Sequence, residues 1–448
     1  NIAYLFKKGG CIGKYFIYLS YKYKMLKIVP NIKSRKLQLF FLCFLSALSY
    51  GMDLETAISE YEKKSYTTKI NETNVKTYDI KDKALKKGPW NEVSVSSQNT
   101  YENSHTYDGI STDNTIKYGL FYYKNTYNIT NSEMTENKIG VSKVLNDYSK
   151  YGDNKYNINV NNIQRNIQKI TNEANRNSEI RDLIDLYKSY KNKEKEMAQE
   201  ALALDDKKKD YAIQAKKYEL GTAAKYDFEL AQTEYETSQL KYENLGRELK
   251  ILKEKFMIYN VTVPENEKFE DIKKVDLKNE DFYKLRLSEV EKIELNESLN
   301  NEKIKKETFD YKYPKITADA GYSIKNKSFT VGVGITKTFK KYNDTIEDLK
   351  NESEKLRLEY EQKKNEILSN VGQEMLNYTT YQTTELINKK NMDIAKQNYT
   401  IYAKRYELGV DTYENYVEKR NAYNKAVIDY EVAKNELAAY TRKIKYYK

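Results

Sequence analysis

The chain has 448 residues, of which 32% are charged, with only 4 Pro and 16 Gly, and this composition favours long helices over many short turns. Its formal charge is +11, but the first 51 residues carry nine Lys or Arg and no acidic residue, which leaves only +2 for the remainder. A nearly neutral body lacks the basic surface that phosphate binding requires, so we expect no nucleic-acid partner.

Residues 1–51 have the features of a short upstream stretch followed by a secretory signal peptide. A basic segment (33–36) precedes a short apolar run (37–48), and the small residues of "SYG" (49–51) suit a cleavage site just before Met52. The apolar run is too short to span a bilayer as a permanent helix, and a membrane anchor is the alternative interpretation. The sequence therefore predicts an exported protein.

Translation is expected to start at Met25. Both cysteines, Cys11 and Cys43, precede the predicted cleavage site, and His105 is the only histidine. The exported part would therefore hold no disulfide, no cysteine metal site, no thiol nucleophile and no site with several His ligands. We expect no enzyme, no cofactor and no bound metal.

An internal duplication organises the rest of the chain. Residues 218–249 and 406–437 align without a gap, and both copies begin with "YELG". A period of 188 residues is too long for a solenoid and indicates the duplication of about half a chain. We therefore expect a first repeat at 52–260 and a second repeat at 261–448.

Each copy of "YELG" interrupts a segment that otherwise favours helix. Residues 153–220 contain neither Gly nor Pro and would extend about 100 Å as one helix. Apolar and aromatic residues recur at spacings of three and four on both sides of each copy, as in a coiled-coil seam. Gly supplies the left-handed conformation that ends a helix. Each copy is thus expected to be the tip of a helical hairpin about 100 Å long, at 218–222 and 406–410.

The second repeat also carries two stretches in which apolar and polar residues alternate. Residues 314–324 and 328–336 alternate over a length that suits a tilted membrane strand, with a short turn between them. We expect a β-hairpin at 314–339; strands of a soluble sandwich are the alternative. The first repeat has a counterpart at 137–145 but carries about 31 additional residues, expected to form a long loop or extended strands near 115–129.

These features together resemble the TolC-like family of outer-membrane efflux proteins. The segment "MDLETAISEYEKKS" (52–65) is similar to the helix that opens the family's mature chains, and "YPKITADAGYS" (313–323) to the start of a family strand. The Tyr-x-x-Gly of both tips matches as well, so the resemblance covers residues 52–448. It implies a mainly α fold with a membrane β-barrel part, in which a β-hairpin and a long helical hairpin are duplicated.

The resemblance also implies a homotrimer in the outer membrane, with a long periplasmic extension. Each subunit would give four strands to a twelve-stranded barrel and four helical segments to a periplasmic α-barrel, while residues 261–295 would join an equatorial belt. The implied function is passive export, as the outer-membrane channel of a tripartite efflux or type I secretion system. A periplasmic adaptor protein would grip the tips and link the channel to an inner-membrane transporter.

By position, the resemblance assigns gate roles to four residues. Asp227 and Tyr406 correspond to an acid–Tyr pair that holds the family's gate closed. Asn415 and Glu418 occupy the positions of two constriction carboxylates, and Asp411 stands where some members have a basic latch. Because the two copies diverge just after "YELG", we expect the second hairpin to be the gate. Adaptor docking is expected at the following tip residues: Tyr218, Leu220, Gly221, Leu408 and Gly409.

Two other functions fit part of the sequence. An exported coiled-coil structural or adhesive protein accounts for the leader and the seams, but not for two matched β-hairpins. A periplasmic adaptor also carries a helical hairpin, but usually one, flanked by a lipoyl-like β domain that we do not find in the sequence.

Overall fold

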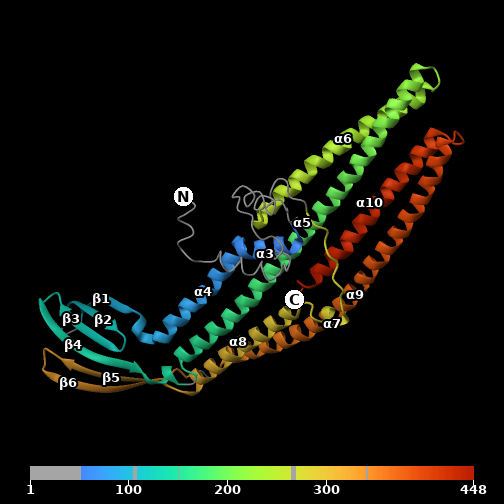
Figure 1. Ribbon diagram of the computed structural model, residues 1–448. Coiled ribbons are helices and arrows are strands. Elements are labelled where there is room, and N and C mark those ends of the chain that lie inside the picture. The colour runs from blue at the N-terminus through green and yellow to red at the C-terminus, as the bar shows by residue number, and fades with distance from the viewer. Residues whose placement is uncertain (1–51, 104–107, 150, 264–268, 340–341, 448) are drawn as a thin grey trace, which may run out of the picture. The chain divides into compact units, whose positions relative to one another are not determined.

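The computed structural model describes residues 52–103, 108–149, 151–263, 269–339 and 342–447 (Figure 1). The predicted leader, its cleavage site and the start at Met25 lie outside these residues. Met52 and Phe269 form an isolated parallel bridge in a small separate unit, and the description below concerns the unit of 53–263 and 270–447.

Long helices and one antiparallel sheet make up the described chain. In chain order the elements are α3 (Leu54–Lys64), α4 (Tyr66–Lys87), the 3-10 turn η2 (Gly88–Asn91), β1 (Val93–Asn103), β2 (Asp108–Tyr118), β3 (Phe121–Asn128), β4 (Glu133–Val144), η3 (Leu145–Tyr148), α5 (Asp153–Glu219), α6 (Lys225–Lys255), η4 (Phe256–Tyr259), α7 (Asn279–Tyr283), α8 (Leu287–Lys312), β5 (Lys315–Ser323), β6 (Ser328–Thr336), α9 (Asp344–Glu407) and α10 (Tyr413–Ile444).

Two helical hairpins, α5–α6 and α9–α10, confirm the duplicated helical unit (Figure 1). The expected hairpin length of about 100 Å is wrong, however. Helix α5 has 67 residues but its returning partner α6 has only 31, so the two arms overlap over about 45 Å. The rest of α5 packs against α4 and α8, and the rest of α9 against α7 and α8. None of the helices in the described chain is apolar enough over enough length to cross a membrane.

Stacked tyrosines in the seams repeat the duplication at the level of single side chains. Tyr211 stacks on Tyr235 at 5.8 Å between ring centroids, and 188 residues later Tyr399 stacks on Tyr423 at 5.6 Å. Nearer the tips, Tyr218 stacks on Phe228 at 5.2 Å, and its equivalent Tyr406 stacks on Tyr416 at 5.2 Å. Offset aromatic pairs of this kind add about 1 kcal/mol beyond the burial of apolar area, so the aromatic seams hold each hairpin together.

The apolar core lies where α5 passes the shorter helices. Ile180, Leu183, Ile184 and Tyr187 of α5 are fully buried. The ring of Tyr187 meets Phe256 edge-on, and its hydroxyl donates to the backbone carbonyl of Glu270 at 2.8 Å. A second cluster packs α7 against α9 and α10; its buried members are Phe282, Leu285, Ile367, Val371, Tyr440 and Ile444.

The six strands of the described residues form one antiparallel sheet in the order β1-β2-β3-β4-β5-β6, with β4–β5 joining the two repeats (Figure 1). The predicted second-repeat hairpin is confirmed as β5–β6. Of the two alternatives for the additional residues of the first repeat, extended strands are confirmed and a long loop is not, because these residues form the complete strand β2 and most of β1 and β3. The expectation of four strands per subunit is therefore wrong, and the sheet has six.

Candidate functional site

Both hairpin tips end their long helix in the same way. Gly221 and Gly409 adopt a φ of +70°, and each donates its N–H at 3.0 Å to the carbonyl three residues earlier, on Tyr218 and Tyr406. The next residue donates to the carbonyl five residues earlier, Thr222 to Lys217 at 2.8 Å and Val410 to Arg405 at 2.9 Å. This pair of bonds is the Schellman motif, which requires the left-handed conformation that Gly adopts without strain.

The tips present apolar side chains to solvent. Leu220 is 76% exposed and Leu408 is 75% exposed, at equivalent positions of the two hairpins. Tyr218 is also exposed in part, although its ring is stacked on Phe228. Two exposed leucines at the ends of long helices are an apolar surface that a partner can cover.

The two tips differ just after Gly, where the sequences diverge. Helix α6 begins after Ala224, which supplies no side-chain cap. Helix α10 begins after Thr412, whose hydroxyl accepts from the backbone N–H of Asn415 at 3.2 Å. Asp411 accepts from the Asn415 side-chain amide at 2.8 Å and pairs with Arg405 at 3.1 Å. The second tip therefore has a capping network that the first tip lacks, and Asn415 is part of it.

Asp411 is held ionised by this network. The hydrogen bond from Asn415 lowers the pKa of the Asp411 carboxyl, and the backbone N–H of Thr412 and the charge of Arg405 lower it further. Asp411 thus links the end of α9 to the start of α10. The family resemblance places a basic latch residue at this position in some members, and Asp411 is acidic.

Tyr406 lies in an aromatic cluster on the side of the second tip that faces α5 and α6. Its ring stacks on Tyr416 and contacts Tyr413, and its hydroxyl accepts a long hydrogen bond from Gln214 at 3.5 Å. Asp227 lies in the first turn of α6 and is half-buried. Within the described residues no hydrogen bond joins Asp227 to Tyr406, so their pairing in a gate stays a prediction. Glu418 is exposed and pairs with Lys419 at 2.8 Å.

A buried arginine below the tips is the feature that our sequence reasoning missed. Arg420 of α10 is 1% exposed, pairs with Asp210 of α5 and lies 3.4 Å from Glu234 of α6. Its guanidinium also lies over the ring of Tyr416 at 5.3 Å. We call Arg420, Asp210 and Glu234 the inter-hairpin clasp, because its cation comes from the second hairpin and both carboxylates come from the first.

A sequence signal for the clasp was available. Arg420 lies beside the tyrosine seam and shares a helix face with Tyr413 and Val417, at spacings of four and three, so this face of α10 is also expected to pack. A charged residue on a packed helix face requires a partner, because an unpaired buried charge is costly. Burial also raises the pKa of the adjacent Tyr416 hydroxyl to about 12, so this group stays neutral beside the clasp.

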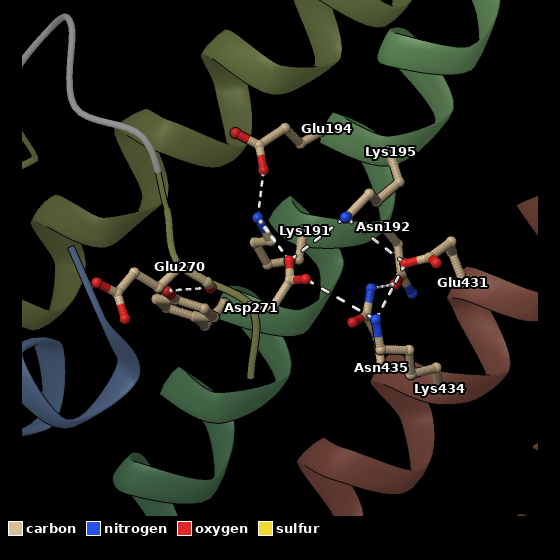
Figure 2. A network of polar contacts seen from close by, with 10 residues as sticks. Lys191, Asn192, Glu194, Lys195, Glu270, Asp271, Glu431, Lys434 and Asn435 are labelled. Carbon is tan, nitrogen blue, oxygen red and sulfur yellow. Dashed lines mark hydrogen bonds and ion pairs between the residues drawn. The ribbon is translucent and has the colours of Figure 1, made fainter. Parts of the chain in front are cut away.

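A second polar network ties the repeats together at the segment that follows residue 269 (Figure 2). Lys191 of α5, whose side chain is almost fully buried, lies 3.2 Å from Asp271. Lys195 of α5 lies 3.4 Å from Asp271 and 3.6 Å from Glu431 of α10, and Lys434 of α10 approaches Asp271 at 3.8 Å. Asp271 therefore joins the segment after residue 269 to helices of both repeats.

Solved structures share this fold. A membrane protein from Pseudomonas aeruginosa aligns with a TM-score of 0.68 at 10% identity, covering 88% of this chain and 93% of that one. The outer membrane protein VceC from Vibrio cholerae aligns with a TM-score of 0.63 at 11% identity, covering 88% and 96%. The open state of the MtrE outer membrane channel from Neisseria gonorrhoeae aligns with a TM-score of 0.66 at 12% identity, covering 88% of each chain.

These likenesses confirm the TolC-like fold that the sequence resemblance predicted. No protein-family model matches the sequence, and a search of the curated proteins finds no match.

Proposed function

We propose that this chain is the outer-membrane channel of a tripartite efflux or type I secretion system, and that it works as a homotrimer. The observation that carries the proposal is one sheet that continues into two helical hairpins, in a fold shared with outer-membrane channels over 88% of the chain. One face of the sheet carries apolar residues such as Ile116, Ile139 and Phe329, and the other carries the ion pairs Lys124–Glu136 and Lys138–Asp319. An apolar outer face and a polar inner face are typical of membrane strands that surround an aqueous lumen.

In this proposal the protein performs no chemistry. Cargo moves passively through the lumen, and an inner-membrane transporter supplies the energy. The exposed Leu220 and Leu408 support docking of a periplasmic adaptor at the tips, together with Tyr218 and the turns at Gly221 and Gly409. An apolar tip surface on a chain with a charged exterior suits a partner with a matching apolar groove.

The gate is proposed at the boundary between the two hairpins. The clasp crosses this boundary, since Arg420 finds both carboxylates on the other hairpin. The Tyr406 cluster lies next to it, with Tyr413 and Val417 of α10 packed on Ala231 of α6. Opening would separate these surfaces, with Asp227 and Tyr406 at the contact, and with Asn415 and Glu418 lining the constriction.

The alternatives explain less of the molecule. A coiled-coil structural or adhesive protein does not require six strands with alternating faces. The similar solved structures are described as an outer membrane protein and an outer membrane channel, and not as periplasmic adaptors.

Gene deletion with complementation tests the proposal. In the deletion strain we expect increased accumulation of a fluorescent dye or loss of a secreted protein, restored by the full chain with its leader. The complementing protein should fractionate with the outer membrane and migrate differently on a gel before and after heating. Leu220→Asp combined with Leu408→Asp should reach the outer membrane without restoring export. Absence from the outer membrane, with unchanged accumulation and secretion, would refute the proposed function.

A further inference from the structure

The six-stranded sheet has two free edges. Among the described residues no strand pairs with the outer edge of β1 or with that of β6. In a bilayer every backbone N–H and C=O needs a hydrogen-bond partner, so a membrane sheet must close into a barrel. Known single-chain barrels have at least eight strands, so six cannot close alone. An even number of antiparallel strands leaves β1 and β6 pointing in opposite directions, and β6 of one copy can therefore pair antiparallel with β1 of another.

Strands β1, β2 and β3, which contain the additional residues of the first repeat, share one apolar face with β4, β5 and β6. Two rows of directly paired residues cross the whole sheet on this face. The first row is Val95, Ile116, Tyr123, Ile139, Tyr322 and Phe329, and the second row is Val93, Tyr118, Phe121, Val141, Ala320 and Val331. Most of these side chains are exposed in the single chain, including Val95, Val331 and Phe329 at the edges. Strands β1–β3 thus carry the same apolar belt as β4–β6.

The opposite face is polar and charged across the same strands. Lys124 of β3 lies 2.9 Å from Glu136 of β4 and 3.9 Å from Asp113 of β2. Lys138 of β4 pairs with Asp319 of β5 at 3.4 Å. Charge pairs therefore run from β2 to β5 on one face. Strands β2 and β3 therefore have an apolar face, as on the lipid side of a membrane strand, and a polar face, as on the side of an aqueous lumen.

The helices also leave a seam uncovered. Ile387, Ile394 and Ile401 of α9 are spaced by seven residues and are 52–57% exposed. A heptad seam of this kind packs against another helix. Within the described chain α9 has no further long helix to cover this face, since it pairs with α7, α8 and α10. A second copy would cover it in a head-to-tail arrangement, which closes into a ring.

From these observations we infer that β6 of one copy pairs with β1 of the next, so that three copies close an eighteen-stranded barrel. The inference rests on the proposed homotrimeric channel and differs from the twelve strands that the family resemblance implies. Because barrel diameter grows with strand number, the outer-membrane exit would be wider than a twelve-stranded one.

Disulfide cross-linking tests the edge pairing. The sequence after residue 51 has no cysteine, so no native thiol there competes with the introduced cysteines for disulfide formation. Gln98→Cys on β1 is combined in turn with Thr330→Cys, Gly332→Cys and Gly334→Cys on β6, which samples the possible registers. We expect at least one oxidised pair to give covalent dimers and trimers on a non-reducing gel. Thr115→Cys with Gly332→Cys is the control and should stay monomeric, because β2 is interior to the sheet.

Lipid contact tests the added strands. A fluorophore on Ile116→Cys, on the apolar face of β2, should be quenched by brominated lipid. The same label on Thr115→Cys, on the opposite face, should not be quenched.

Three outcomes overturn the barrel: a disulfide within one chain, free thiols in all three edge pairs, or no quenching at position 116. If the same variants reach the outer membrane and restore export, the channel function stands and only the eighteen-stranded barrel fails. Absence from the outer membrane refutes both.

Discussion

At the residue scale, the clasp shows how one charge can join two repeats. Arg420 is fully buried, whereas Asp210 and Glu234 keep some contact with solvent. The attraction of Arg420 to both carboxylates and its contact with Tyr416 offset the cost of removing it from water. Removing the cation would leave the first hairpin with two carboxylates close together at its boundary with the second hairpin.

We therefore expect Arg420→Met to loosen the hairpin contact by about 2 kcal/mol, below the ~3–5 kcal/mol of a fully buried pair because both acids are partly solvated. Hydrogen exchange of α10 amides near the tip should accelerate accordingly. Lys419→Met is the matched control and should change little, since the contacts of Lys419 with Glu418 and with the ring of Tyr402 stay within the second hairpin. Equal effects of the two substitutions would contradict the clasp. Adding Asp210→Asn and Glu234→Gln to Arg420→Met should recover part of the protection.

The proposed gate pair makes a second prediction. Tyr406→Phe combined with Asp227→Ala should raise single-channel conductance in planar bilayers, because it removes a contact proposed to hold the tips together. Gln214→Leu removes the hydrogen bond that the structure gives to Tyr406 and serves as the comparison. Unchanged conductance and unchanged leakage of drugs in the double variant would remove both residues from the gate.

A third prediction concerns Glu418, which is proposed to line the constriction. Glu418→Gln should weaken the block of the channel by divalent cations, because a ring of exposed carboxylates would attract them. Glu414→Gln, an exposed acid in the first turn of the same helix, should leave the block unchanged. Full block in the Glu418 variant would mean that this side chain lies outside the pore.

At the scale of the elements, the tips depend on backbone conformation and not on packing. A Cβ added at Gly221 or Gly409 would meet no atom within 4 Å, yet both residues have a φ of +70°. Any cost of a side chain there is therefore the cost of the left-handed conformation itself. Gly372 within α9 has equally open surroundings, but its conformation is helical.

We expect Gly409→Ala and Gly221→Ala each to destabilise its tip by about 1 kcal/mol. Gly372→Ala should instead stabilise α9 by about 1 kcal/mol, because Ala is the better helix former. Hydrogen exchange of the adjacent amides would measure both signs. The same sign at all three positions would show that the tip turns do not depend on the left-handed conformation.

At the scale of the whole molecule, Asp271 links the two repeats through α5 and α10 (Figure 2). Burial alone would raise the pKa of the Asp271 carboxyl, but the charges of Lys191 and Lys195 and the hydrogen bond from Lys191 lower it overall. A carboxyl whose pKa is lower in the folded than in the unfolded chain stabilises the fold above the unfolded value, near pH 4. That stabilisation is lost as pH falls through the lower folded value.

Thermal unfolding followed by circular dichroism should therefore show less stability at pH 3 than at pH 6. Asp271→Asn should reduce this difference by removing one of the responsible carboxylates. Asp276→Asn, an exposed position in the same segment, should leave the difference unchanged. An acid sensitivity that is the same in both variants would exclude Asp271 as a contributor.

The sequence by itself determined the features that depend on neighbouring residues. Helix periodicity and the φ of Gly221 and Gly409 are local properties that the duplication made visible twice, and the absence of Gly and Pro from 153–220 is a further local property of the first repeat. The second-repeat strands were predictable for the same reason, because their faces alternate with period two.

Only the tertiary structure decided which distant segments meet. The sequence left a loop and extended strands open for the additional residues of the first repeat, because their Asn-rich pattern is too weak to choose between them. The structure decided for strands, since β3 pairs with β4 and extends the sheet. The length of the hairpin overlap and the partners of Arg420 depend on contacts between α5, α6 and α10, whose residues lie up to about 200 positions apart. Contacts between residues at such separations depend on the whole fold, and no local sequence pattern predicts them.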